Sequence, residues 1–282
     1  MKTILSLLIV GLFSTSTFAQ SAAEIQNTGD NFSLEGALAL LKKATSIEDF
    51  ETLLNTESNN VNNLDLNNDG QTDYVSVDDI QNDNSHILVL STSLNDTEKQ
   101  DIATIHIEKT GNKDATLQIV GDNDLYAENT VVEPFETTET QTNQKGPNAS
   151  ELIINQVFVN VWFWPSIQFM YAPSYVLWRS PYRWHNYPRW YRPWNPFGYS
   201  QFYNRCAPHR FYYRPAVSFR FGNSRNFYAP YRHRSVVYRN NFRVHNTIYR
   251  GNRNYNRNQN FNRGGAMKPN RVKMNGGGHG RR

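Results

Sequence analysis

Residues 65–77 carry the most informative pattern of the chain and read Asp65-Leu66-Asn67-Asn68-Asp69-Gly70-Gln71-Thr72-Asp73-Tyr74-Val75-Ser76-Val77. Gly70 allows a sharp turn at which oxygen-bearing side chains can converge. Three carboxylates within nine residues repel one another unless a cation lies between them. The pattern predicts a Ca²⁺ site made of the following residues: Asp65, Asn67, Asp69, Gln71 and Asp73. A turn without metal is the alternative, because Asp, Asn and Gly also dominate turns.

The loop 65–73 resembles the calcium loops of EF-hands and dockerins, and this resemblance implies Ca²⁺ as a cofactor. Ser76 stands where an EF-hand has a bidentate Glu. The residues after Asp73 alternate as in a strand rather than recurring as in a helix. We therefore expect a loop-to-strand version with weak affinity, on the order of 10⁻⁴ to 10⁻³ M.

Two short helices are expected before the loop and several strands after it. Ser33 and Ser46 are placed to cap helices whose apolar residues recur at helical spacing. Alternating runs separated by turn residues predict strands over 74–80, 86–90, 102–107 and 116–120. The predicted fold class is α+β: a small antiparallel sheet of roughly three or four strands with two N-terminal helices on one face. A largely irregular or disordered basic aromatic tail is expected to follow it.

The charge of the chain is divided between two halves. All 25 Asp and Glu residues lie at or before Glu151, and between Gln20 and Glu151 only six lysines oppose them, which gives a net charge of −19. Residues 152–282 contain 20 Arg, two Lys and no acid, which gives +22. Such an asymmetry predicts two segments that have different partners or that are partners of each other. The single Cys206 excludes a disulfide within the chain.

The N-terminus predicts export. Lys2, an apolar run from Ile4 to Phe13 and the small residues before Gln20 have the order of a signal peptide, 1–19. We expect the mature chain in the periplasm, on the outer surface or outside the cell, with no transmembrane span; an uncleaved anchor is the alternative. The mature chain is expected to consist of an acidic α+β domain 20–135, a polar linker 136–151 and a basic tail 152–282, of which 239–282 is expected to be disordered.

The most apolar stretch outside the predicted signal peptide begins the tail, at 152–164. Val and aromatic residues favour a strand there, and Pro165 ends the run. This strand could complete the sheet of the domain, pair between chains, or rest at a membrane interface, where Trp and Tyr are favoured. Completion of the sheet is the preferred interpretation.

From Tyr171 onward, Arg and aromatic residues alternate with Pro, which interrupts helix and sheet. Arg supplies charge and aromatic rings supply stacking, the composition of sequence-tolerant binding to polyanions. The candidate polyanion-binding residues are Arg179, Arg183, Arg189, Arg192, Trp178, Trp184, Trp190 and Trp194. Expected partners are lipopolysaccharide, acidic polysaccharide or nucleic acid, with peripheral membrane contact as a further option. The alternatives are acidic domains of other copies or the acidic domain of the same chain.

Enzymatic motifs are missing from the sequence: it has no Gly-rich phosphate loop, nucleophile elbow or His-Glu-x-x-His. His86 and His106 lie in predicted strands and could face one another, but two such histidines are a weak signal. The chain is predicted not to be an enzyme.

As a whole, the chain resembles uncharacterised exported proteins of Bacteroidota that join a small domain with a DxNxDGxxD loop to a tail rich in Arg, aromatic residues and Asn. This resemblance implies export and the calcium loop, and it implies no activity. The predicted function is a non-enzymatic exported protein with a calcium-supported domain and a cationic aromatic tail that binds polyanions. The alternative is a self-assembling surface or matrix component whose tail pairs with acidic domains.

Overall fold

The computed structural model describes residues 28–141 and 152–239 of the 282-residue chain. The predicted signal peptide 1–19 and residues 240–282 of the predicted disordered end lie outside this range. No helix of the described residues is long and apolar enough to cross a membrane.

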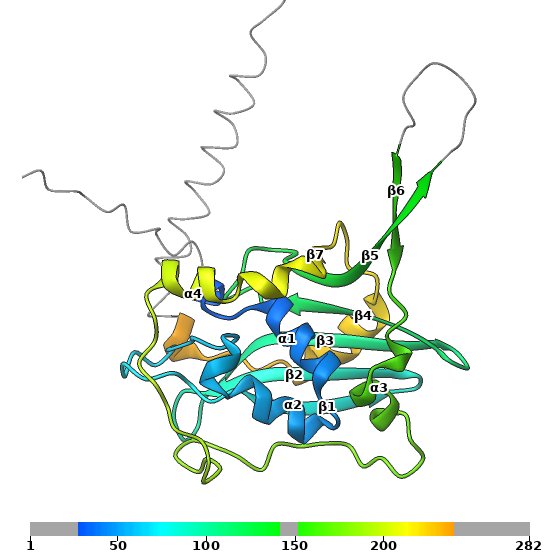
Figure 1. Ribbon diagram of the computed structural model, residues 1–282. Helices are drawn as coiled ribbons and strands as arrows, with labels where there is room; N and C mark the ends of the chain where they lie inside the picture. Colours follow the sequence, from blue (N-terminus) through cyan, green and yellow to red (C-terminus); the bar gives the residue numbers. More distant parts are fainter. Residues whose placement is uncertain (1–27, 142–151, 240–282) are drawn as a thin grey trace, which may run out of the picture.

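Two capped helices, α1 (Leu34–Lys43) and α2 (Ile47–Leu54), precede the acidic loop (Figure 1). The Ser33 hydroxyl accepts a hydrogen bond from the Gly36 amide at 2.9 Å, and the Ser46 hydroxyl accepts one from the Asp49 amide at 3.0 Å. These bonds satisfy amides that have no partner within the helix, which explains where both helices begin. Short 3₁₀ helices lie at Thr28–Asn31 (η1), Glu57–Asn59 (η2), Val161–Phe163 (η3), Ala207–Phe211 (η4) and Ala229–Tyr231 (η5).

The strands form one antiparallel sheet, which confirms the α+β class. In the part of the chain that the structure describes, the order is β1-β2-β3-β4-β5-β6, with β7 paired to β5. The four strands predicted after the loop exist, and three of them are longer than expected. The strand bounds are Ser76–Asn82 (β1), Ser85–Ser93 (β2), Lys99–Gly111 (β3), Asp114–Gly121 (β4), Val131–Gln141 (β5), Leu152–Phe158 (β6) and Tyr213–Pro215 (β7).

The sheet is larger than predicted because β5, β6 and β7 extend it. β5 runs to Gln141 and pairs with β6, from Phe135 opposite Phe158 to Gln141 opposite Leu152. The predicted linker 136–151 is therefore wrong over 136–141. Its polar composition suggested a linker, but it is rich in Thr, a β-branched residue that fits a strand. The apolar stretch that begins at Leu152 completes the sheet over β6, as preferred.

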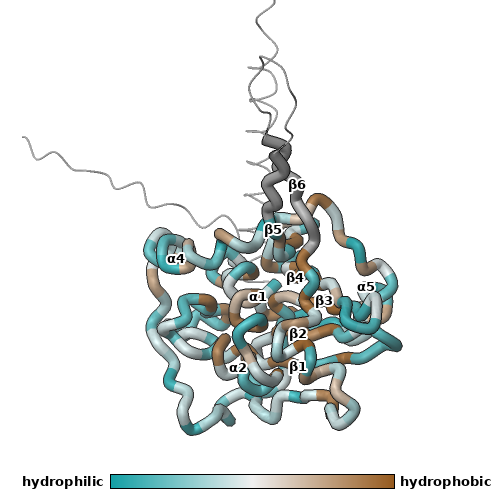
Figure 2. The backbone as a smooth tube through the Cα atoms, turned by 45° about the vertical axis from the view of Figure 1, so that its right-hand side comes forward, coloured by the Kyte–Doolittle hydropathy of each residue, from teal (hydrophilic) through white to brown (hydrophobic). Residues whose placement is uncertain are grey.

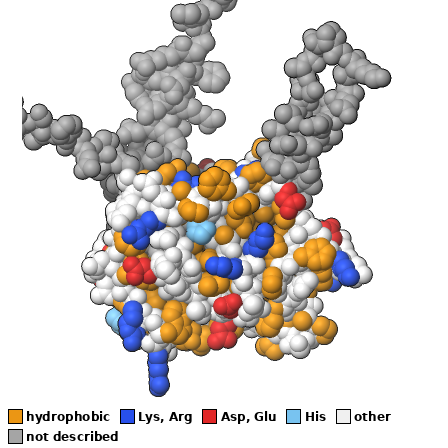
Figure 3. Space-filling model, in the orientation of Figure 1, with side chains coloured by type: hydrophobic (Ala, Val, Ile, Leu, Met, Phe, Trp, Pro, Cys, Tyr) orange, Lys and Arg blue, Asp and Glu red, His pale blue; other side chains and the backbone are white. Residues whose placement is uncertain are grey.

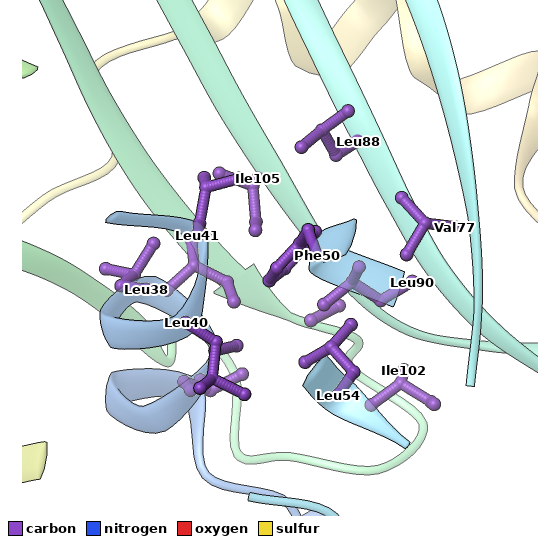
Figure 4. Close-up of a cluster of buried hydrophobic side chains, with 14 of the residues drawn as sticks. Leu38, Leu40, Leu41, Phe50, Leu54, Val77, Leu88, Leu90, Ile102 and Ile105 are labelled. Carbon is purple, nitrogen blue, oxygen red and sulfur yellow. The ribbon is translucent and has the colours of Figure 1, made fainter. Parts of the chain in front are cut away.

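The main core lies between the sheet and the two N-terminal helices. Figure 4 shows Leu38 and Leu41 of α1 and Phe50 and Leu54 of α2 lying over strand residues such as Leu88, and all five are fully buried. The helical residues recur at intervals of three and four, so they share the face turned to the sheet. Burial of each such side chain contributes about 1.5–3 kcal/mol relative to exposure.

The basic half packs against the acidic half on both faces of the sheet, so the described part of the predicted tail is not a separate region. Its helices are α3 (Pro165–Met170), α4 (Tyr199–Arg205) and α5 (Gly222–Tyr228). Trp164 and Ile167 enter the same core as α1, whereas Tyr228 packs with Ile87 on the opposite face. Figure 2 shows the hydrophobic strands of the sheet between α1 and α2 on one side and α5 on the other. Hydrophobic periodicity did not predict this packing, because the aromatic residues are irregularly spaced.

Candidate functional site

The acidic loop is closed by hydrogen bonds to its own backbone. The Asp65 carboxylate accepts from the Gly70 amide at 3.0 Å and from the Asp69 amide at 3.1 Å. The Asp69 carboxylate accepts from the Gln71 amide at 2.8 Å, and Asn67 donates to Asp69 at 3.0 Å. Gly70 has φ +81°, which favours glycine. The predicted metal ligands are thus gathered in one tight turn.

The carboxylates of this loop are crowded enough to disturb one another. Asp73 is 6 % exposed and accepts a hydrogen bond from the Leu66 amide at 2.6 Å. Burial raises its pKa to about 8, and the charges of Asp65 and Asp69 add to the effect. Burial also raises the pKa of Asp65. The oxygen donors and their mutual repulsion fit a hard cation. Within residues 28–141 and 152–239, however, no three His, Cys, Asp or Glu side chains are grouped tightly enough to form a ready-made metal site.

An extended segment packs against the end of the loop, at Thr72 and Tyr74, and leaves residues 68–71 exposed. We call residues 171–197, which run along the lower edge of Figure 1 between α3 and α4, the arginine strap. The Thr72 amide donates to the Trp194 carbonyl at 2.8 Å, and the Tyr191 hydroxyl donates to the Thr72 carbonyl at 2.6 Å. Tyr187 stacks on Tyr74, directly after the loop, at 5.4 Å between ring centroids. Burial raises the pKa of Tyr191, and the charges of Asp73 and Asp69 reinforce this rise, which places the strap in the field of the loop carboxylates.

The four predicted polyanion-binding arginines all lie on the strap with exposed side chains, namely Arg179, Arg183, Arg189 and Arg192. None of them forms an ion pair with an acidic side chain of the described residues. The Arg192 guanidinium donates to the Arg189 carbonyl at 2.8 Å and therefore stays at the surface. Figure 3 shows basic side chains spread over one face of the molecule, some of them reaching outward near its lower left edge.

The four predicted stacking tryptophans are not brought together as one platform. Trp178 is half-buried, and its indole donates to Glu51 at 3.0 Å. Trp184 is half-buried against His185, with ring centroids 4.5 Å apart. Trp194 is half-buried beside the loop, and Trp190, at 45 % exposed, alone offers a largely free ring among the four. The strap is therefore better suited to bind a ligand through charge than through aromatic stacking.

Glu51 fixes the strap to the acidic half, and the sequence analysis missed it. This carboxylate is 1 % exposed and accepts hydrogen bonds from the Ser180 hydroxyl at 2.7 Å, the Tyr74 hydroxyl at 2.8 Å and the Val77 amide at 3.0 Å, besides that from Trp178. Burial raises its pKa, and the hydrogen bonds counter that rise. A signal existed in the sequence, because Glu51 lies one turn from Ile47 and Leu54 on the apolar face of α2. A carboxylate at such a position needs polar partners.

A second basic segment, residues 213–239, is bound to the acidic half by ion pairs, and we call it the paired segment. Arg214 reaches the Glu133 carboxylate at 3.1 Å, and Arg220 contacts its other oxygen. Arg232 reaches Asp122 at 2.6 Å, and Arg234 reaches Asp124 at 2.7 Å. These contacts realise, within one chain, the alternative in which the basic half neutralises its own acidic half.

The pKa shifts of these carboxyl groups follow from the same contacts. Burial opposes ionisation of Glu133, but the hydrogen bonds of Gln118 and Arg220 and the charge of Arg220 outweigh it and lower its pKa. Burial likewise opposes ionisation of Asp124, and the hydrogen bond and charge of Arg234 with the charge of Arg232 lower its pKa. The ion pairs therefore stabilise the ionised forms of Glu133 and Asp124, whereas burial raises the pKa of Asp122 and outweighs the hydrogen bond and charge of Arg232.

The two histidines in strands do not face one another. His106 lies opposite Ile87 in the register of β2 and β3, and His86 lies opposite Ile107, so alternation places the two rings on opposite faces of the sheet. His86 contacts the buried Asp79 at 2.8 Å, and Asp79 also accepts from the Tyr175 hydroxyl at 2.7 Å. This pair is sealed beneath the strap.

No family model matches this chain, and comparisons with curated proteins and with solved structures find no match.

Proposed function

We propose that this protein is a non-enzymatic exported protein whose arginine strap binds polyanions of the cell envelope or its surroundings. One observation carries the proposal: the four strap arginines are exposed and without acidic partners among the described residues, whereas four arginines of the paired segment are engaged in internal ion pairs. Guanidinium groups match phosphate and carboxylate oxygens in bidentate geometry, so an anionic polymer is the natural ligand of such a surface.

Charge supports phosphate and carboxylate polymers over stacked nucleobases as ligands. Stacking on single strands depends on free aromatic faces. Trp178 is held by Glu51, and only Trp190 of the four tryptophans is largely exposed. We therefore favour lipopolysaccharide phosphates or acidic polysaccharide, with nucleic acid bound through its backbone.

Export is part of the same proposal, supported by the signal-like residues 1–19. Cell fractionation with an antibody against the acidic half tests it directly. Recovery of a chain lacking residues 1–19 in the periplasm, on the surface or in the medium is expected. A full-length chain in the cytoplasm would contradict it.

The acidic loop is proposed to bind Ca²⁺ beside the strap, through the side chains of Asp65, Asn67, Asp69 and Asp73 and the Gln71 carbonyl. When bound, the ion would neutralise Asp65 and Asp69, whose charges add to the rise that burial causes in the pKa of Asp73. Support comes from the donor set and from the crowding of the carboxylates. The role is structural, since Tyr191 and Trp194 of the strap hydrogen-bond to Thr72 at the end of the loop, while residues 68–71 remain exposed.

The salt dependence of binding tests the polyanion proposal. A chain that lacks residues 1–19 should bind heparin, lipopolysaccharide and duplex DNA, and its affinity should fall as salt rises. Four phosphate contacts predict a loss of about 100-fold between 50 and 200 mM salt. Replacing the four strap arginines by Gln should remove most of this dependence.

A matched variant separates the strap from general charge. Lys42, Lys43, Lys113 and Arg205 are exposed and lie outside the strap. Their replacement by Gln removes the same charge, and binding should be largely kept. Equal loss of binding in both variants would contradict a site on the strap, and Trp190→Leu should weaken binding only slightly.

The self-assembly alternative predicts different behaviour. The ion pairs of the paired segment are formed within one chain, which leaves Glu133, Asp122 and Asp124 engaged. Sedimentation should therefore show no salt-sensitive oligomers in the absence of a polyanion. Oligomers that dissolve with salt and disappear in the strap variant would favour the alternative.

A further inference from the structure

A cavity of about 230 Å³ lies on the face of the sheet opposite α1 and α2. β3 and β4 form its floor, and α5 with the residues that follow forms its wall. None of its lining residues belongs to the arginine strap or to the acidic loop. It is therefore separate from the proposed polyanion surface. The residues that matter for its chemistry are Thr104, His106, Val120, Asp122, Arg225 and Tyr228.

His106 is a lining residue of this cavity and carries an unsatisfied polar atom. The residue is 2 % exposed, and its Nε2 lies 2.9 Å from the Thr104 hydroxyl. Its Nδ1 is buried and has no hydrogen-bond partner among the described residues. Burial lowers the pKa of His106 to about 3, with a further contribution from the charge of Arg225, so the ring is neutral at physiological pH. A buried polar atom without a partner is uncommon and calls for a ligand or water.

Arg225 brings a positive charge that no acidic side chain of the described residues compensates. It lies over the Phe219 ring, 4.9 Å from the ring centroid, and is half-buried. Throughout the described ranges, no acidic side chain lies within ion-pair distance of Arg225. Asp122 is engaged by two nitrogens of Arg232, at 2.6 and 2.7 Å. The cavity therefore has one uncompensated cation.

We propose that this cavity binds a small monocarboxylate with a short apolar body. The Thr104 hydroxyl donates to His106 Nε2, which leaves the proton on Nδ1, and this N–H donates to the carboxylate beside Arg225. Ala103, Val120 and Ala229 supply apolar walls for the body of the ligand.

Charge and size select this ligand class over others. A cation would meet Arg225 and Arg232, and a dianion would meet the Asp122 carboxylate with only one free positive charge to hold it. Liquid water takes about 30 Å³ per molecule, so the cavity has room for roughly eight non-hydrogen atoms. An aliphatic acid such as butyrate fits this limit.

Calorimetry on the chain that lacks residues 1–19 tests the proposal with butyrate against its neutral isostere butyramide. Butyrate should bind at least about tenfold more tightly than the amide, because a charge-assisted hydrogen bond is roughly twice as strong as a neutral one. Arg225→Gln should abolish this preference. Arg189→Gln, which removes an exposed charge on the strap, should leave it unchanged. Equal affinity for acid and amide, or no binding of either at about 10 mM, would overturn the proposal.

Nitrogen NMR of the His106 ring provides a readout that does not depend on a variant. Butyrate should shift the Nδ1 resonance and leave the resonances of His185 unchanged, since His185 lies on the strap. Thr104→Val should weaken butyrate binding by releasing Nε2 from its partner, with the fold checked by the amide spectrum. A bound butyrate that leaves the His106 nitrogens unshifted would also overturn the assignment.

Discussion

The arginine strap and the paired segment have nearly the same composition and opposite relations to the acidic half. Both are rich in Arg and aromatic residues, and both pack against the same sheet, the strap along its β1 edge. The strap is held by Glu51 through an indole and a hydroxyl, and its arginines point to solvent. The paired segment is held through its arginines. Composition alone therefore does not assign a role to an arginine, because the acidic residue that lies opposite decides it.

The positions of the carboxylates in the acidic half explain why one segment is ion-paired and the other is not. Glu133 in β5 and Asp122 after β4 are buried beneath the paired segment, at 3 % and 9 % exposed. Beneath the strap, Asp79 is occupied by His86 and Tyr175 instead. The strap arginines thus remain available for an external anion.

Acidification should destabilise the contacts of the paired segment more than those of the strap, and this is the largest difference expected between the two segments. Burial lowers the pKa of His106 from its ordinary value to about 3 on folding. The contribution of the neutral ring to the free energy of unfolding is therefore complete above the unfolded pKa and is lost as the pH falls toward 3. The loss amounts to about 4–5 kcal/mol at 1.36 kcal/mol per unit. The lowered pKa values of Glu133 and Asp124 act in the same direction, whereas the raised pKa values of Asp73 and Asp122 act in the opposite one, so the contribution of His106 is the difference between the unchanged chain and the His106→Gln variant. Urea unfolding between pH 7 and pH 3 measures the slope, which His106→Gln should flatten.

Hydrogen exchange along this titration locates the effect. Phe219 and Phe221 contact the His106 ring, so amides of the paired segment should lose protection first. If amides of the strap lost protection before those of the paired segment, the prediction would be contradicted.

Glu133→Gln should release the paired segment at neutral pH. The change removes the charge that binds Arg214 and Arg220 and should lower the free energy of unfolding by about 2–3 kcal/mol, less than for a fully buried pair because both arginines are partly exposed. Urea denaturation measures it. Glu136→Gln, an exposed neighbour on the same strand, is the matched control and should stay within about 0.5 kcal/mol. Equal effects of the two changes would show that the ion pairs of Glu133 do not stabilise the fold.

Calcium should act on the strap side only. With a dissociation constant of about 1 mM, 10 mM Ca²⁺ would stabilise the fold by about 1.4 kcal/mol, and protease protection should rise in the strap. Asp69→Ala should abolish the gain measured by thermal unfolding, and the exposed Asp96→Ala should keep it. A gain that survives Asp69→Ala would exclude the loop as its source.

The smallest effect on stability is expected for the strap arginines themselves. Replacing all four by Gln should change the free energy of unfolding by no more than about 0.5 kcal/mol, because they are exposed and unpaired within the described residues. Chemical denaturation of the variant used for polyanion binding gives the value. A loss above about 1.5 kcal/mol would show that the strap arginines serve the fold.

Local patterns predicted the parts of the fold that local physics controls. The caps at Ser33 and Ser46 and the alternating runs around His86 and Ile105 are readable, because capping and strand periodicity depend on neighbours in sequence. The exposed strap arginines were also predicted, as was the loop that gathers Asp65 and Asp69.

Long-range pairing was not readable from the chain. The bond from Ser180 to Glu51 spans 129 residues, and that from Arg214 to Glu133 spans 81. Arg214 and Arg192 sit in similar local sequences, and only the folded sheet distinguishes them. The His106 cavity escaped for the same reason, since its chemistry depends on Arg225 arriving from α5.

The shared core also sets an order of events during synthesis. Tyr238, 1 % exposed, packs in the same core as Leu41, so the core closes only after the last described helical turn has left the ribosome. Ninety-seven residues separate Gln141 from Tyr238, and at ordinary rates their translation takes about 5 to 20 s. During that interval the nascent chain carries a strongly negative first half without its basic counterpart. Like charges repel, so the charge that later holds the paired segment in place first favours solubility of the unfinished chain.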